Sequence, residues 1–114
     1  MKTTTTGALR FMSLDVYRVA REMVVAVGRL GVKHPALRDQ LTRACTSVML
    51  NLAEGLPSRS APMRRKFFAT AQGSAYEVAA GVDAALALRS IEEEDAAPVL
   101  ALCDRGSAML YRMQ

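Results

Sequence analysis

Apolar residues recur at three- and four-residue steps along four segments of the chain, which is the period of an amphipathic α-helix. The first of these stripes runs from Val16 to Leu30, and Ser13 before it is a residue type that often caps a helix amino terminus. Gly31 and Pro35 then interrupt the pattern. The sequence therefore predicts a first helix that follows a cap at Ser13 and ends near Leu30.

Proline and glycine set the bounds of the next two stripes. Pro35 suits the first turn of a second helix, which should stop at Gly55 in a left-handed cap conformation. A third helix is expected to open at Ser60, with Pro62 just inside it, and to continue to about Arg89. It should be the longest helix of the chain.

The fourth stripe runs from Val99 to Met113 and follows an acidic first turn. Ser90 and Glu93 have the spacing of a capping box. Because the connections between the four helices are short, neighbouring helices should be antiparallel. The predicted fold is therefore all-α: an antiparallel up-down four-helix bundle over residues 13–114, after a flexible N-terminal segment at residues 1–12.

Apolar residues make up 51% of the 114-residue chain, more than a small bundle easily buries, so some of them should lie in subunit contacts. The third helix is also rich in small residues. Its interior glycines, Gly73 and Gly81, each cost about 1 kcal/mol against alanine and need a compensating close approach. A tight crossing within the chain and a contact between subunits both meet that need.

The cellular setting is expected to be cytoplasmic and soluble. The first residues lack the apolar core of a signal peptide, and no stretch approaches the roughly 20 apolar residues that span a bilayer. No membrane partner is therefore expected. Cys45 and Cys103 lack a metal-ligand spacing, so they are predicted to be reduced, buried thiols.

Charge is uneven along the chain. Residues 1–66 hold 12 basic and four acidic residues, whereas residues 67–114 hold three basic and seven acidic ones. The first two helices and the start of the third should thus form a basic part that an anionic partner would meet. Solvated charge without a partner is the alternative. The candidate phosphate contacts are Arg38, Arg43, Arg59, Arg64, Arg65 and Lys66.

No catalytic constellation is visible. His34 is the only histidine and is expected to be a surface loop residue. Asn51, Glu54 and Glu77 form a weak ligand set without a histidine, so we predict no metal, no cofactor and no catalytic residue. The protein is not expected to be an enzyme. Asn51 and Glu54 should instead hold the end of the second helix and the turn that follows it by hydrogen bonds.

One family resemblance rests on the run from Ser47 to Gly55, an apolar helical stretch that contains Asn51 and Glu54, and on Gln40–Ala44 just before it. Paired aromatics and a glycine-serine step in the third helix extend it. These blocks resemble the signature of the small four-helix-bundle proteins named after intervening sequences of bacterial large-subunit ribosomal RNA. The motif residues are Ser47, Asn51, Glu54, Gly55, Ser74 and Glu77.

The resemblance implies a closed homo-oligomeric ring, preferably a homopentamer, and favours Gly73 and Gly81 as subunit contacts. A related bundle, the accessory protein of diversity-generating retroelements, is a basic pentamer that partners a reverse transcriptase and binds nucleic acid. The leading hypothesis is thus a non-enzymatic oligomeric protein that associates with RNA or DNA, with a reverse transcriptase or another protein as a further partner. The alternative is a protein-interaction scaffold with no nucleic-acid affinity.

Overall fold

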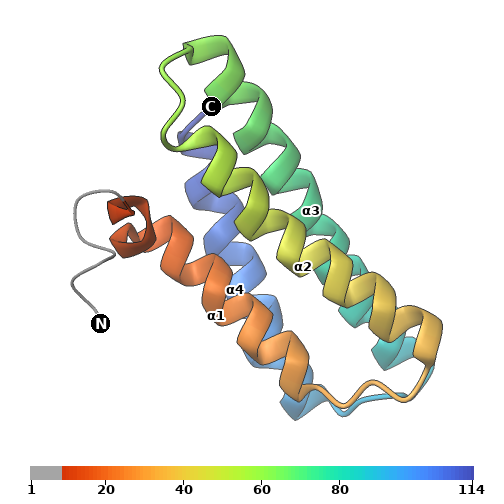
Figure 1. Cartoon of the computed structure of the whole chain (residues 1–114). Helices are drawn as coiled ribbons and strands as arrows, with labels where there is room; N and C mark the ends of the chain where they lie inside the picture. The colour runs from red at the N-terminus through yellow and green to blue at the C-terminus, as the bar shows by residue number, and fades with distance from the viewer. Residues whose placement is uncertain (1–8) are drawn as a thin grey trace.

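The computed structural model describes residues 9–114, and this part of the chain forms helices without any strand. The elements are η2 (Arg10–Ser13, a 3-10 helix), α1 (Asp15–Arg29), α2 (Pro35–Gly55), α3 (Ala61–Ala87) and α4 (Glu93–Arg112) (Figure 1). The predicted all-α fold with four helices is confirmed. The N-terminal segment predicted at residues 1–12 overlaps η2, and residues 1–8 lie outside the described part. None of the helices in residues 9–114 combines the length and apolarity that crossing a membrane requires.

The start of α1 differs from the expectation. Leu14, with extended backbone angles, occupies the N-cap position, and Ser13 is the last residue of η2, so the cap predicted at Ser13 was wrong. The reason is the extra turn before the helix, in which the backbone N–H of Leu14 donates to the carbonyl of Phe11. The Phe11 ring packs edge-on against Tyr17, with 5.3 Å between ring centroids. This contact attaches η2 to α1.

The left-handed glycine lies at Gly31 and not at Gly55. Gly31, which follows the end of α1, has a φ of 65°, the left-handed conformation that glycine tolerates best. Gly55 is the last residue of α2 and has no positive φ, so the left-handed cap predicted there was wrong. A Cβ at Gly55 would lie 2.8 Å from Cε1 of Phe68 and 2.9 Å from Cβ of Phe67. Glycine is needed at position 55 because α3 approaches the backbone closely.

The start of α3 follows the prediction. Ser60 is the N-cap, and its hydroxyl accepts a hydrogen bond of 3.3 Å from the backbone N–H of Met63. Pro62 lies in the first turn, and α3 is the longest helix with 27 residues. It ends at Ala87, two residues before the predicted Arg89.

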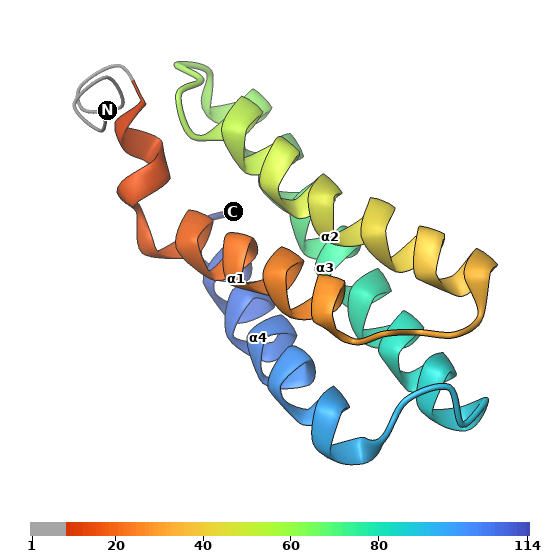
Figure 2. The same cartoon turned by 60° about the horizontal axis from the view of Figure 1, so that its bottom comes forward.

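The capping box predicted for α4 was wrong. The N-cap is Glu92 and makes no side-chain cap bond. The hydroxyl of Ser90 instead accepts a 2.8 Å hydrogen bond from the backbone N–H of Lys33. This bond ties the α1–α2 connection to the α3–α4 connection, because both lie at the same end of the molecule (Figure 2). The acidic first turn is confirmed as Glu93, Glu94 and Asp95.

The core is built from all four helices, and α2 and α3 share the most extensive contact in the fold. Leu41, near the start of α2, lies against Gly81 near the end of α3, whereas Gly55 at the end of α2 lies against Phe68 near the start of α3. These two helices therefore run in opposite directions, side by side in both views (Figures 1 and 2). Fully buried side chains come from each helix and include Met23, Leu52, Val78, Val99 and Leu110.

Both cysteines are buried and free, and we expect their thiols to be unreactive in the native protein. Burial raises the pKa of Cys103 to about 11, with a smaller contribution from Cys45, and burial also raises the pKa of Cys45. Since the thiolate is the nucleophile, a thiol with a raised pKa stays protonated and inert near pH 8. Ellman's reagent should therefore label neither cysteine until denaturant is added. Rapid labelling of the native protein would contradict this expectation.

Candidate nucleic-acid interface

Four cations gather around the connection between α2 and α3, and we call Arg59, Arg64, Arg65 and Lys66 the basic turn. No acidic residue lies between positions 59 and 66. Three of the side chains are exposed, whereas Arg64 is half-buried and donates from Nη1 to the carbonyl of Ser58 at 2.8 Å. Arg64 thus holds the turn, and the other three cations face solvent.

The amino terminus of α3 adds to the positive charge of the basic turn. A helix amino terminus carries about half a positive charge, which favours a phosphate nearby. Arg64, Arg65 and Lys66 all lie within the first two turns of α3, after Pro62 and Met63. Side-chain charge and helix dipole therefore favour an anion at the same end of the molecule.

Arg38 and Arg43 lie elsewhere. They belong to the first half of α2, whose start is at the opposite end of the bundle from the basic turn (Figure 1). The 17 residues from Arg38 to Gly55 correspond to a rise of about 25 Å. Arg38 donates from Nη1 to the carbonyl of Val32 at 3.1 Å, and Arg43 donates from Nη2 to Oε1 of Gln40 at 3.0 Å. The structure therefore brings together four of the six predicted phosphate contacts and separates the other two.

The positive excess is also more local than expected. α2 carries two basic and two acidic residues, and α1 carries three basic and two acidic ones. The first two helices are therefore not the basic surface that the sequence suggested. The cations concentrate at the basic turn, because the acidic residues of α1 and α2 offset most of the arginines on those helices.

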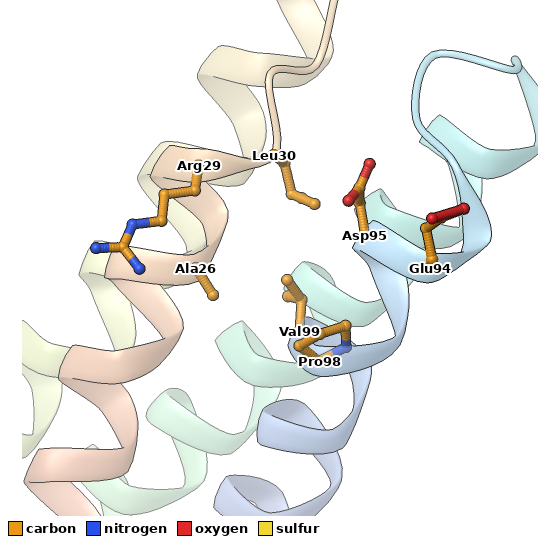
Figure 3. Close-up of a pocket in the computed structure, with 7 residues that line it drawn as sticks. All are labelled: Ala26, Arg29, Leu30, Glu94, Asp95, Pro98 and Val99. Atoms are coloured by element: carbon orange, nitrogen blue, oxygen red, sulfur yellow. The ribbon is translucent and has the colours of Figure 1, made fainter.

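The opposite end of the molecule contains an acidic hollow of about 240 Å³ between α1 and α4. Glu94 and Asp95 lie on one side, and the guanidinium of Arg29 extends away from both carboxylates (Figure 3). The other residues that line the hollow are Ala26, Leu30, Pro98 and Val99. Two carboxylates repel phosphate, so this hollow is unsuited to the anionic partner that the basic turn favours.

Four of the family-like motif residues, together with Gln40, form a polar seam between α2 and α3. The hydroxyls of Ser47 and Ser74 are 2.9 Å apart and share a hydrogen bond across the two helices. Asn51 donates from Nδ2 to the backbone carbonyl of Ser47 at 2.8 Å and to its hydroxyl at 3.1 Å. Nearer the start of α2, Nε2 of Gln40 donates to Oε2 of Glu77 at 2.6 Å. The seam therefore pairs side chains across the contact between α2 and α3.

Glu54 does not belong to the polar seam. It is exposed at the end of α2, and Asn51 bonds backward to Ser47, not forward to the turn. The prediction that both side chains hold the end of the helix was therefore wrong. The reason is that α2 ends by continuing its backbone pattern, with the N–H of Leu56 donating to the carbonyl of Leu52 at 2.8 Å.

Replacing Asn51 by alanine is expected to lower the free energy of unfolding by about 1 kcal/mol, because two hydrogen bonds at a half-buried position are lost. Glu54→Ala is the matched control on the next turn and should change it by less than about 0.5 kcal/mol. Urea unfolding followed by circular dichroism measures both. Equal effects of the two substitutions would contradict the assignment of Asn51 to the seam.

The two glycines of α3 have different surroundings. A Cβ at Gly81 would lie 2.6 Å from Cδ2 of Leu41, so this glycine permits a tight crossing within the chain. A Cβ at Gly73 would meet nothing within 4 Å, and Gly73 is exposed. Of the two explanations for the interior glycines, a tight crossing within the chain applies to Gly81. Gly73 instead faces outward.

His34 has a structural role that the sequence reading missed. It is exposed, as expected, but it occupies the N-cap of α2, and its Nδ1 accepts a 3.2 Å hydrogen bond from the backbone N–H of Leu37. Histidine is not a usual cap residue, so the only sequence signal for this capping role was the position of His34 directly before Pro35. Across residues 9–114, no group of three histidine, cysteine or acidic side chains is placed to hold a metal ion.

Two exposed tyrosines were also missed. Tyr76 of α3 has 58% of its surface exposed and Tyr111 of α4 has 71%. Both line a groove of about 300 Å³ between α3 and α4, which we call the tyrosine groove; its other lining residues are Gln72, Asp104, Ser107, Ala108 and Arg112. Tyr76 lies two residues before the buried Val78, a spacing that points the two side chains to different sides of the helix. This spacing was the sequence signal for the exposure of Tyr76.

A comparison with protein families gives one match. The family model described as 23S rRNA-intervening sequence protein matches residues 12–112 of the chain. The chain belongs to this family. The match begins within η2 and ends at the last residue of α4, so it covers all four helices. The resemblance that rested on the run from Ser47 to Gly55 is confirmed. A search of curated proteins gave no match.

Proposed function

We propose that this member of the 23S rRNA-intervening sequence protein family is a non-enzymatic, oligomeric bundle protein that associates with nucleic acid. The basic turn makes the phosphate contacts. The observation that carries the proposal is the grouping of four cations, three of them exposed, at the positive end of α3. Selectivity for sequence is weak, because phosphate contacts carry no direct sequence information.

The family supports RNA as a partner, since its name refers to an intervening sequence of 23S ribosomal RNA. The net charge of +4 favours either nucleic acid, because electrostatic attraction to phosphate does not depend on the sugar. RNA is therefore the first partner to test, with DNA of the same length beside it.

We also propose that the helices form an antiparallel up-down bundle and that bundles assemble into a closed homo-oligomeric ring, preferably a pentamer. Support comes from small uncharged residues on the outward face of α3, where Ala69, Gly73, Ala80 and Ala87 are exposed, with Asp83 as a charged residue among them. Gly73 leaves open space where a neighbouring helix can approach. A ring repeats the basic turn by symmetry and multiplies the phosphate contacts.

Native mass spectrometry of the protein purified from its host tests both parts together. The expected result is a particle whose protein mass is five times 12.3 kDa, with additional mass that nuclease removes. A particle without nucleic acid, combined with no binding to added RNA or DNA, would favour a protein-interaction scaffold instead.

Replacing Gly73 by leucine is expected to reduce the assembly to smaller species while the protomer stays folded. The side chain meets nothing within 4 Å in the protomer, but it would fill the space that a neighbouring helix needs. Light scattering coupled to gel filtration measures the mass, and circular dichroism verifies the fold. Unchanged mass would remove the Gly73 face from the contact.

A further inference from the structure

The tyrosine groove is built differently from the basic turn, because aromatic rings and an amide network shape it. Nε2 of Gln72 donates to the hydroxyl of Tyr76 at 3.0 Å and to the backbone carbonyl of Ser107 at 3.3 Å. Oε1 of Gln72 accepts a 2.7 Å bond from Nε2 of Gln114. Gln72 therefore fixes the Tyr76 ring and joins α3 to the end of α4. The groove is held in place before anything binds.

The two tyrosine side chains of the groove are accessible from solvent. Tyr76 and Tyr111 keep more than half of their surface exposed, and they approach the groove from the two opposite helices. Aromatic faces of this kind stack nucleobases, and stacking tolerates any base because every base has a π-face.

Each of the two helices that form the groove carries a cation toward the basic turn. Arg112 lines the groove itself. Arg65 lies seven residues before Gln72, hence on the same face of α3 and about 10 Å away along the helix axis. The end of α4 and the basic turn share one end of the molecule (Figure 1). A strand whose bases enter the groove can therefore place its phosphates on Arg112 and Arg65.

One carboxylate, Asp104, also lines the groove. It repels phosphate but accepts hydrogen bonds from N–H groups of bases, such as the ring N–H of uracil, as acidic side chains do from cytosine. The Asp104 carboxylate therefore favours bases over phosphates inside the groove. The phosphates would contact the arginines that lie toward the basic turn.

We infer that the tyrosine groove binds the unpaired bases of a single-stranded nucleic acid, whose phosphates continue onto Arg65 and the basic turn. The inference rests on the proposed nucleic-acid function and adds to it the class of ligand: single strands are preferred over duplexes of equal charge. A base inside a duplex is already stacked on both faces and cannot lie on a tyrosine ring.

Anisotropy titrations test the inference with three labelled probes of about 12 units: a single-stranded oligouridylate, an abasic strand with the same phosphates, and a duplex. The wild type should bind the oligouridylate most tightly. Tyr76→Ala and Tyr111→Ala should each weaken oligouridylate binding about tenfold or more and leave abasic-strand binding unchanged. Leu50→Ala, at an exposed apolar side chain of α2, is the matched control and should change neither.

Intrinsic fluorescence gives a second readout, because the chain has three tyrosines and no tryptophan, and Tyr17 is buried. Oligouridylate should quench the emission of the wild type, whereas the abasic strand should not. If the tyrosine variants bind all probes as the wild type does, the inference fails and the phosphate contacts of the proposed function stand. A changed oligomeric mass with unchanged affinity would also overturn it, by making the groove a contact between copies. If the wild type binds no probe, the proposed function fails as well.

Discussion

Changing Arg59, Arg65 and Lys66 to glutamate is expected to weaken nucleic-acid binding by about a hundredfold or more at roughly 0.1 M salt. Each phosphate contact adds about 0.9 to the slope of log affinity against log salt for duplex DNA, so the slope should fall by about 2 to 3. The three side chains are exposed, and the bundle should stay folded. Arg64 is left in place, because its bond to the carbonyl of Ser58 holds the turn.

The control for this experiment makes the same change of charge elsewhere. Changing Arg21, Arg29 and Lys33 to glutamate reverses three exposed cations on α1 and the connection after it. If attraction depended on net charge alone, the two triple variants would weaken binding equally. The basic turn predicts a much larger loss for the first variant. Anisotropy titrations at several salt concentrations separate the two results.

Replacing Gly55 by alanine is expected to lower the free energy of unfolding by about 1 to 3 kcal/mol. The added Cβ would lie 2.8 Å from the Phe68 ring and 2.9 Å from Cβ of Phe67. Phe68 is buried and the Cβ of Phe67 is fixed to the backbone, so α2 and α3 have to move apart. Urea unfolding measures the loss, and light scattering verifies the oligomeric mass.

Gly28→Ala is the matched control for this substitution. It adds the same methyl group near the end of α1, where nothing lies within 4 Å and no subunit contact is proposed. Alanine is the better helix former, so the free energy of unfolding should rise by up to about 1 kcal/mol. Equal losses at both positions would show that the contact with Phe67 and Phe68 is not the reason for glycine at position 55.

Helix existence could be predicted from the sequence because hydrophobic periodicity and proline position report on local geometry. α2 begins at Pro35 and α3 at the Ser60 cap, as expected. Two of the errors at helix ends come from contacts between segments far apart in sequence. The Ser90 hydroxyl accepts a hydrogen bond from Lys33 and does not cap the helix that follows it. Glycine is required at position 55 because Phe68 approaches closely, not because the backbone has a positive φ. The residue pattern of a single sequence does not show which distant segments come into contact.

The candidate interface was predicted in part for the same reason. A run of cations such as Arg64, Arg65 and Lys66 is visible in the sequence and stays together on a helix. Arg38 and Arg43 lie in the first half of α2, and the length of that helix separates them from the basic turn. The tyrosine groove needs the register between α3 and α4, which no local pattern supplies.

The central claim is that the basic turn gives this protein an affinity for nucleic acid. The most direct test is an anisotropy titration of the wild-type protein with labelled RNA and DNA, from low to physiological salt. The account predicts binding at low salt that weakens linearly in log affinity against log salt. Absence of binding at low salt, where electrostatic attraction is strongest, would contradict it.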